Sequence, residues 1–201
     1  PLVGSANDVS NQINSGSTTK VVTVGSGAAA SSAQSNFYGG SYLFDGSANA
    51  YMTIPENNDW DWGTGDYTAE AWAYMTSQAD NYVCSTTISS SWWGINFWSN
   101  GGSNNTVRAG YNSKHEVTYQ WQNNQWYHVA VSRESGVSRL FVDGVLLESK
   151  ADTDNLDSTG LFQIGRDPQS WGLEYTGYIQ DLRVYNGVAK YTENFIPAST
   201  N

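Results

Sequence analysis

Apolar and polar positions alternate in several short runs between residues 37 and 201, and helical periodicity is limited to a stretch near 188–191. Runs rich in β-branched and aromatic residues, bounded by Gly, Asn and Asp, are typical of strands. The strands predicted in this way cover residues 51–55, 67–75, 95–98, 126–133, 139–149 and 178–185. Short strands at this spacing predict an all-β fold, a sandwich of antiparallel sheets.

The strongest local signal is the pair Asp143 and Gly144, which interrupts the apolar run at residues 139–149. Both central residues of the commonest two-residue hairpin turn have positive φ, and an Asp-Gly pair tolerates that conformation. The sequence therefore predicts a tight β-hairpin at this point.

The first 36 residues have a different texture, with no aromatic residue and an excess of Ser, Gly, Ala, Asn and Thr. Only residues 21–24, with the sequence VVTV, resemble a strand. Such a composition is typical of loops and weakly packed segments. We therefore expect residues 1–36 to form an N-terminal arm with a possible short strand at 21–24, and residues 37–201 to form the sandwich.

The composition narrows the range of partners. The net charge is −10, and the nine basic residues are scattered singly, so binding to nucleic acid is not expected. No apolar run approaches the roughly 20 residues of a membrane-spanning helix, so membrane insertion is not expected. Cys84 is the only cysteine and is interpreted as a small buried hydrophobic residue.

Six segments together resemble a laminin-G-like domain of the concanavalin A-like superfamily. They are YLFDG (42–46), GTGDYTAEAWAYM (63–75), NQWYHVAVSR (124–133), RLFVDG (139–144), QIG (163–165) and GYIQDLRVYNGVAKYTENF (177–195). The resemblance implies a jelly-roll β-sandwich of two curved sheets. The ending is similar to laminin-G-like modules of bacteriophage tail fibres and other virion surface proteins. The fold carries lectins, adhesion modules and hydrolases alike, so it does not by itself imply a function.

Catalysis is not expected. Relatives that hydrolyse glycosides carry Glu-x-Asp-x-x-Glu on one strand, which places an acid and a nucleophile on the same face. The chain has no such run, and Glu70 stands alone among Ala, Trp and Tyr, so we interpret it as structural. His115 and His128 have no metal-ligating residues at useful spacing, and His128 fits a strand. The prediction is a protein that is not an enzyme and uses no cofactor.

A bound metal is not expected either. The segment 150–158 offers Asp152, Asp154 and Asp157, which are suitable oxygen ligands for calcium, but Leu156 interrupts the ligand pattern and no bidentate Glu follows. We interpret the segment as a solvated acidic loop. The other acidic stretch, residues 56–66, contains Trp60 and Trp62 and is expected to pack against the core.

Gln180 and Asp181 are adjacent polar residues in a strand. Alternation predicts that Gln180 shares a face with Leu182, while Asp181 shares the other face with Arg183 and forms an ion pair with it. Many relatives have Asp where Gln180 stands, and in some of them it helps to hold calcium. Because Gln lacks the charge of that carboxylate, we expect calcium binding to be weak or absent here.

The remaining candidates are tryptophans. The resemblance assigns Trp72 and Trp126 to the core. Five others match core positions less clearly and are candidate ligand-binding residues: Trp92, Trp93, Trp98, Trp121 and Trp171. Trp93 and Trp171 are flanked by Gly or Ser, which suggests exposure. Core packing is the favoured interpretation for any single one, but we expect at least one of the five to stack on a sugar.

The leading functional hypothesis is a non-catalytic structural or adhesive module of a bacteriophage virion, such as a tail fibre, a spike or a capsid-surface decoration. At the virion surface its partners would be other virion proteins or copies of itself, with a cell-surface glycan as a further candidate. The alternative is a secreted bacterial carbohydrate-binding module.

Overall fold

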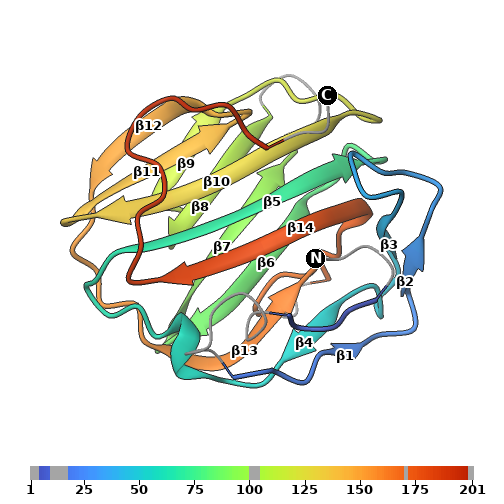
Figure 1. The fold of residues 1–201 in the computed structure, drawn as a ribbon, viewed down its shortest axis with the longest axis horizontal. Coiled ribbons are helices and arrows are strands. Elements are labelled where there is room, and N and C mark those ends of the chain that lie inside the picture. The colour runs from blue at the N-terminus through green and yellow to red at the C-terminus, as the bar shows by residue number, and fades with distance from the viewer. Residues whose placement is uncertain (1–4, 10–17, 100–104, 170–171, 199–201) are drawn as a thin grey trace.

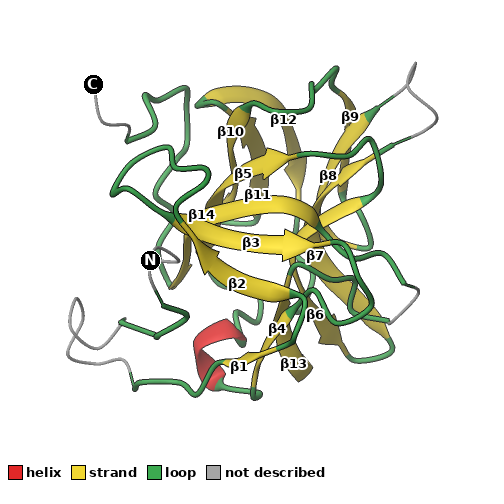
Figure 2. Ribbon diagram, turned by 90° about the vertical axis from the view of Figure 1, so that its right-hand side faces the viewer, coloured by secondary structure: helices red, strands yellow, loops and turns green. Residues whose placement is uncertain are grey.

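The computed structural model describes residues 5–9, 18–99, 105–169 and 172–198. They form two antiparallel sheets of seven strands each, stacked face to face, with β5, β10 and β14 in front of β6, β7 and β8 in Figure 1. The all-β prediction and the jelly-roll sandwich are confirmed. The helix content of the described residues is one 3-10 turn, Asn58–Trp60, drawn red in Figure 2, and no described helix is long and apolar enough to cross a membrane.

Sheet A has the strand order β1-β4-β13-β6-β7-β8-β9. Its strands are β1 (Thr23–Val24), β4 (Met52–Ile54), β6 (Asn81–Ile88), β7 (Ser91–Trp98), β8 (Thr106–Tyr111), β9 (His115–Thr118) and β13 (Ser158–Ile164). Sheet B has the order β12-β11-β10-β5-β14-β3-β2. Its strands are β2 (Ala28–Ser31), β3 (Ser41–Asp45), β5 (Tyr67–Met75), β10 (Trp126–Glu134), β11 (Val137–Val142), β12 (Val145–Ala151) and β14 (Thr176–Asn186).

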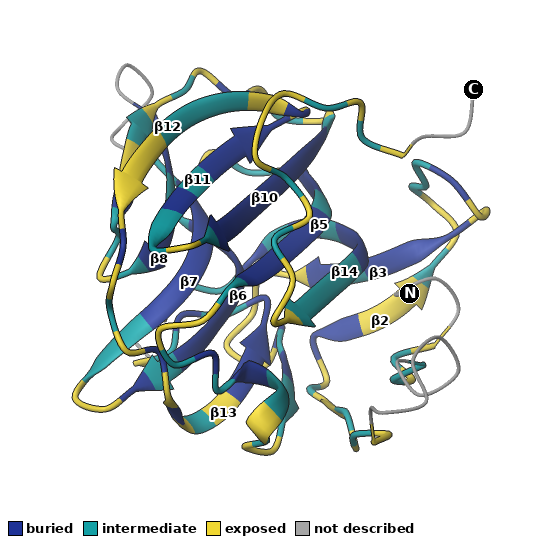
Figure 3. Cartoon of the chain, turned by 60° about the vertical axis from the view of Figure 1, so that its left-hand side comes forward, coloured by how far each residue is buried: buried dark blue, intermediate teal, exposed yellow. Residues whose placement is uncertain are grey.

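The core lies between the sheets and follows from the alternation of the central strands. On β5, the small side chains of Ala69, Ala71 and Ala73 face inward. They leave room for bulky residues of the opposite sheet, among them Trp93 and Phe97 of β7, which have no exposed surface. The burial colouring in Figure 3 shows β5, β10 and β6 almost wholly dark blue, whereas the edge strand β12 is teal and yellow. Large aromatic residues thus fill the interface between the sheets.

The hairpin at Asp143 and Gly144 is confirmed. The two residues have φ values of 49° and 75° and connect Val142 to Val145, which are paired across β11 and β12. Gly144 has a second reason to be glycine, because an added Cβ would lie 1.9 Å from the carbonyl oxygen of Phe195. The hairpin therefore also receives the C-terminal segment, whose Phe195 N–H donates to the Gly144 carbonyl at 2.9 Å.

Part of the N-terminal region expected to form an arm contributes strands at the sheet edges. β1 pairs with β4, and β2 pairs with β3. The residues of both strands are mostly exposed or half-buried, and only Ala28 of β2 belongs to the core. The wider division into an arm at 1–36 and a sandwich at 37–201 stays a prediction.

Several strands are absent from the sequence prediction, notably β6, β8, β9 and β13. They carry polar residues at buried positions (Ser, Thr, Asn or Gln in β6, β8 and β13, and His115 in β9), so their apolar pattern is broken. For example, Asn81, Ser85 and Thr86 of β6 are all buried. No helix forms at 188–191, where the backbone has no regular structure.

Candidate functional site

Gln180 and Asp181 lie at a bulge in β14, and the bulge changes which side chains of the strand point to each face of the sheet. The register against β5 shifts between Gln180 and Arg183, and Asp181 has φ +54°. Gln180 pairs with Trp72 and Arg183 pairs with Glu70, so both lie on the outer face of sheet B. The prediction that Gln180 shares a face with Leu182 is therefore wrong, because the extra residue of the bulge breaks the alternation. The predicted ion pair is confirmed, with Arg183 Nη2 2.6 Å from Asp181 Oδ2.

The fully buried amide of Gln180 organises the turn at residues 36–40. Its Oε1 accepts from the backbone N–H groups of Asn36 and Phe37, at 3.0 and 3.3 Å. Its Nε2 donates to the carbonyl oxygens of Phe37 and Gly40. Carbonyl oxygens of this kind would be calcium ligands, but here they are satisfied by amide N–H groups. The residues at this position do not fit calcium. Among the described residues there is no group of three or more His, Cys, Asp or Glu side chains that could hold a metal.

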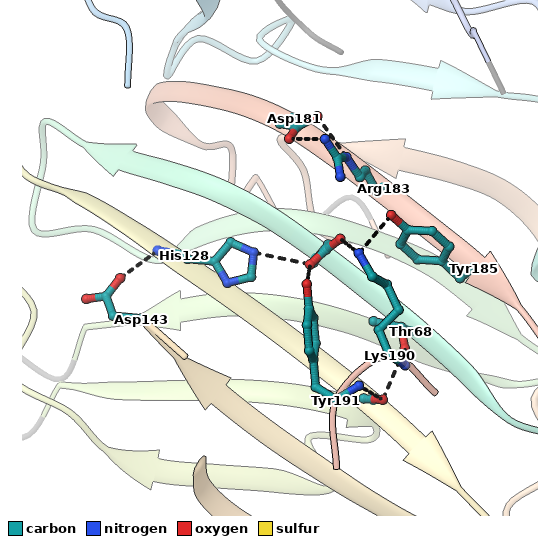
Figure 4. Close-up of polar contacts among 10 residues, drawn as sticks. Thr68, His128, Asp143, Asp181, Arg183, Tyr185, Lys190 and Tyr191 are labelled. Atoms are coloured by element: carbon teal, nitrogen blue, oxygen red, sulfur yellow. Dashed lines mark hydrogen bonds and ion pairs between the residues drawn. The ribbon is translucent and has the colours of Figure 1, made fainter. Parts of the chain in front are cut away.

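Glu70 is buried, and a network around it fastens the C-terminal segment across the outer face of sheet B; Figure 4 labels its partners His128, Lys190 and Tyr191. Tyr191 donates its hydroxyl to Glu70 Oε2 at 2.6 Å, and Lys190 Nζ lies 3.0 Å from Oε1. His128 Nε2 lies 3.3 Å from Oε2, and the ring of Phe195 stacks on that of Tyr191. The structure thus gives Glu70 a structural role, as predicted.

Electrostatics explains why a buried carboxylate is tolerated there. Burial raises the pKa of Glu70, but the hydrogen bonds from His128 and Tyr191 and the charge of Lys190 outweigh it, and the pKa falls to about 2. The pKa of Tyr191 rises to about 12 because its hydroxyl is buried and donates to Glu70. The group is therefore a fixed anion under ordinary conditions rather than a proton donor.

His115 connects the two sheets instead of binding a metal. Its side chain is fully buried, with Nε2 2.8 Å from Ser138 Oγ of β11 and Nδ1 3.1 Å from Glu148 of β12. Burial lowers the pKa of His115. The Cys84 thiol is also fully buried, as predicted, and burial raises its pKa to about 12.

The acidic segment at 150–158 is only partly a solvated loop. Asp152 has no exposed surface and lies 3.6 Å from the buried Arg133 and 3.5 Å from Lys114. The expectation of a solvated carboxylate is therefore wrong for Asp152, because long-range ion pairs that cannot be seen in the local sequence enclose it. Arg133 also donates to the carbonyl oxygens of Gly63 and Gly65, which holds the neighbouring loop in place. In that loop Trp60 and Trp62 are buried, as predicted.

The candidate tryptophans separate into three groups. Trp93 and Trp121 have no exposed surface, and the Nε1 of Trp93 donates to the hydroxyl of Tyr67 at 3.1 Å. The expectation that Trp93 is exposed is wrong, because β7 places it on the core side, and a fully buried ring offers no face to a sugar. Trp171 lies outside the described residues. Trp92 and Trp98 are half-buried and both belong to the outer side of β7.

Trp72 and Trp126 do not belong to the core, contrary to the prediction. Both are half-buried and lie on the outer face of sheet B, on β5 and β10. Trp126 is paired with Tyr74, which in turn is paired with Tyr178 of β14, so three aromatic residues form one row across three strands. The alternation of YTAEAWAYM indicates this facing, because it separates Glu70, Trp72 and Tyr74 from the intervening alanines.

The outer face of sheet A carries the most distinctive arrangement, which we call the β7 track. Along β7 the outward positions are Trp92, Gly94, Asn96 and Trp98, whereas Trp93, Ile95 and Phe97 enter the core. At ~3.3 Å per residue, the Cα atoms of Trp92 and Trp98 are about 20 Å apart. Two half-buried indoles therefore bracket an extended strip of the sheet.

Gly94 and Gly110 lie at the middle of the track, and both are buried. Gly94 is paired with Gly110 on one side and with Ser85 on the other. A Cβ at Gly94 would lie 3.0 Å from the Cys84 carbonyl oxygen and 3.3 Å from Ser85 Cβ. The close approach of the neighbouring strand thus requires glycine there, and the neighbouring Asn96 and Ser85 are buried as well.

Polar groups without partners lie beside this strip. Asn96 has no exposed surface, and neither polar atom of its side chain has a hydrogen-bond partner in the described part of the chain. The Nε of Arg108 and the Oγ1 of Thr106 likewise have none among residues 5–9, 18–99, 105–169 and 172–198. Buried polar groups are nearly always hydrogen-bonded, so these atoms indicate a bound water or a ligand hydroxyl.

The charges at the track are largely balanced. Arg108, which pairs with Asn96 across the sheet, stacks on Trp98 at 4.2 Å from the ring centroid. Its guanidinium also bonds Glu116 at 2.7 Å. Tyr82, on the other side of Asn96, is buried, and its pKa is raised chiefly by that burial and secondarily by the charge of Asp167. The track combines aromatic faces with neutral hydrogen-bonding groups.

The two packed seven-stranded sheets define the class of protein as a jelly-roll sandwich. The model of the concanavalin A-like lectin/glucanases superfamily matches residues 45–193, and the chain belongs to this family. Comparison with curated proteins found no match.

Several solved structures share the fold. Domain 4 of AbnA, an extracellular arabinanase from Geobacillus stearothermophilus solved with arabinotriose, has a TM-score of 0.64 and 16% identity, covering 86% of this chain and 84% of that chain. The binding domain of Paraclostridial Mosquitocidal Protein 1 has a TM-score of 0.65 and 11% identity, and the match covers 90% of this chain and 46% of that chain. A structure from work on the cell entry of botulinum neurotoxin type C has a TM-score of 0.58 and 10% identity. The match covers 83% of this chain and 43% of that chain.

These similarities establish the fold. The chain spans most of the arabinanase domain but less than half of the two toxin chains.

Proposed function

We propose that the chain is a non-catalytic module that binds a neutral oligosaccharide along the β7 track. The observation that carries the proposal is the pair of half-buried indoles, Trp92 and Trp98, on one face of one strand, with the unpaired amide of Asn96 between them. A flat indole offers an apolar face to a sugar ring, and an unpaired amide can both donate to and accept from hydroxyl groups.

The length of the track favours an oligosaccharide over a single sugar. The Cα atoms of Trp92 and Trp98 are about 20 Å apart, from the rise of a strand, and this distance is several sugar rings long. Asn96 itself is covered, so it would reach the ligand through a bound water or after a shift of Arg108.

Charge favours a neutral ligand. The chain carries a net charge of −10, and the exposed Glu116 already neutralises Arg108. An acidic sugar would be repelled by the whole molecule and would have to compete for that guanidinium. Neutral sugars avoid both costs.

A binding role without catalysis agrees with the carboxylates near the track. The outward residues of β7 include no Asp or Glu, and Glu70 is buried on the opposite sheet beneath the C-terminal segment. The paired acid and nucleophile of a glycosidase therefore have no counterpart on this strand. The arabinanase domain supports the proposal, since it was solved with the neutral arabinotriose. The gangliosides on which the entry of botulinum neurotoxin type C depends are acidic, so that relative supports glycan binding in general.

The setting we propose is the surface of a bacteriophage virion, where the module would be part of a tail fibre, a spike or a capsid decoration. The support for it is the similarity of the ending, DLRVYNGVAKYTENF, to phage modules. A secreted bacterial carbohydrate-binding module is the alternative, and the arabinanase domain favours it. Mass spectrometry of purified virions would separate the two settings.

The binding test uses an array of neutral and acidic glycans, followed by calorimetry of the oligosaccharides retained. We expect Trp92→Ala and Trp98→Ala to weaken binding roughly tenfold or more, since truncating an aromatic anchor of a binding site commonly costs more than about 1 kcal/mol. Trp126→Ala, on the outer face of sheet B, is the matched control and should bind like the wild type. Equal losses in all three variants, or retention of acidic glycans alone, would contradict the proposal.

A further inference from the structure

A second feature, which we call the amide pocket, lies at the end of the sandwich beyond Trp98. It has a volume of about 390 Å³ and is lined by Gln78, Asn105, Gln120, Trp121, Gln122 and Asn123. Asn105 directly precedes Thr106, the residue paired with Trp98 across β7 and β8. The pocket therefore adjoins the strand end next to Trp98, while its Trp121 packs on Phe97, which enters the core from the opposite face of β7.

The chemistry of the lining is unusually uniform. Five of the six lining residues carry a side-chain amide, and none of these described residues carries a charge. An amide presents both a carbonyl acceptor and N–H donors. Such a lining suits a ligand with several neutral groups that donate and accept at once, which is the chemistry of sugar hydroxyls, and it offers nothing to balance an ion.

Two buried polar atoms of the lining have unmet hydrogen-bonding capacity. Asn105 is 2% exposed, and its Nδ2 donates to Gln78 Oε1 at 2.7 Å, but its Oδ1 has no partner within the described ranges. The indole Nε1 of the fully buried Trp121 also has none among the described residues. One acceptor and one donor in the same pocket are therefore available for a ligand or water.

Backbone and side-chain contacts both hold the wall of the pocket, and Gln78 Nε2 donates to Asn123 Oδ1 at 3.3 Å. The Gln122 N–H donates to the Tyr127 hydroxyl at 2.8 Å, and the Tyr119 N–H donates to the Asn105 carbonyl at 2.9 Å. The Trp121 ring packs edge-on against Phe97 of the core. Backbone anchored in this way reduces the ordering cost of binding.

We propose that the amide pocket is a subsite for one neutral sugar unit at the Trp98 end of the β7 track. This inference rests on the proposed function and extends it, since the pocket would hold the unit that continues the oligosaccharide past Trp98. Affinity should therefore rise when the ligand becomes long enough to reach the pocket from the track.

The test measures the affinity of a length series of neutral linear oligosaccharides, from disaccharide upward and including arabinotriose, by calorimetry. Gln78→Ala and Asn123→Ala remove two lining amides at the surface, and Gln125→Ala removes an exposed amide of the same turn that does not line the pocket. We expect both pocket variants to lose about tenfold in affinity for the longest ligands and nothing for the shortest. Gln125→Ala should match the wild type at every length.

A second measurement follows the side-chain amide resonances of Asn105 and Asn123 by NMR during titration with the longest oligosaccharide. Both should shift in the wild type, and a variant that folds poorly does not affect this readout. If the pocket variants bind every length like the wild type while Trp92→Ala fails, the pocket inference is overturned and the proposed function stands. If no neutral oligosaccharide binds the wild type, both are overturned.

Discussion

The outer faces of the two sheets use polar residues in opposite ways. On sheet B, the buried Glu70 has both carboxylate oxygens engaged by Lys190, Tyr191 and His128, and the C-terminal segment lies over it. On sheet A, the equally buried Asn96 has no partner for either polar atom among the described residues. A buried polar group that is fully bonded stabilises the fold, whereas one left unpaired costs free energy unless a water or ligand completes it. Whether a buried polar group is hydrogen-bonded therefore distinguishes a structural residue from a candidate binding residue better than its residue type does.

Neighbouring tryptophans of β7 give the sharpest and largest test of this difference. Trp93 is fully buried between the sheets and packs edge-on against Trp62 and Tyr67. Trp93→Ala should lower the free energy of unfolding by about 3–5 kcal/mol, the usual cost of a large aromatic cavity. Trp92→Ala should cost much less, because its ring is half-buried on the outer face. Urea denaturation measures the free energy of unfolding of both variants. If Trp92→Ala lowers it as much as Trp93→Ala does, Trp92 is a core residue.

The second prediction concerns the pH dependence of the sheet B network. The folded pKa of Glu70, about 2, lies below that of an unfolded glutamate. The ionised group therefore stabilises the protein above an unfolded pKa of about 4.3, and this contribution of about 3 kcal/mol is lost as the pH falls towards 2. Glu70→Gln should remove that part of the acid dependence and loosen the C-terminal segment.

Thermal unfolding between pH 5 and pH 2 checks this prediction, with Glu193→Gln as the control. Glu193 lies in the same C-terminal segment but is exposed. Its variant should retain the acid dependence of the wild type. If Glu70→Gln and the wild type lose stability in parallel over this range, the network does not fasten the segment as described.

Much of the fold follows from the sequence because local pattern and tertiary packing agree. The strand at 67–75 and the Asp143-Gly144 turn have the expected bounds, since alternation and turn chemistry are local properties. β6 and β13 were not predicted because buried Asn, Ser, Thr and Gln in them depend on partners far along the chain. Ser158 of β13, for example, bonds Thr86 of β6 at 2.7 Å.

The candidate site was only partly predictable for a related reason. Trp92 and Trp98 were among the candidates, but the pairing of Gly94 with Gly110 and the unmet amide of Asn96 require the registers of three strands. A sign was present in WWGINFW, where alternation separates Trp92, Asn96 and Trp98 from Trp93 and Phe97. The bulge at Asp181, where φ is +54° and the register against β5 shifts, left no such sign in the pattern of the strand.

The last and smallest expected effect concerns calcium at Gln180, on the fully bonded side of the comparison. Because Gln180 Nε2 donates to the carbonyl oxygens of Phe37 and Gly40, calcium should change the melting temperature of the native protein little. Gln180→Asp removes both donors and places a carboxylate beside those oxygens, which should cost about 1–3 kcal/mol without calcium. Calcium should restore part of this loss, because a ligand bound only by the folded state stabilises it by RT ln(1 + [L]/Kd). Gln180→Asn, which is shorter and uncharged, should lose stability without any recovery. Melting temperatures of the three proteins in calcium and in chelator test this prediction. Strong calcium stabilisation of the native protein would contradict the view that the Gln180 amide fills the position of a calcium ion.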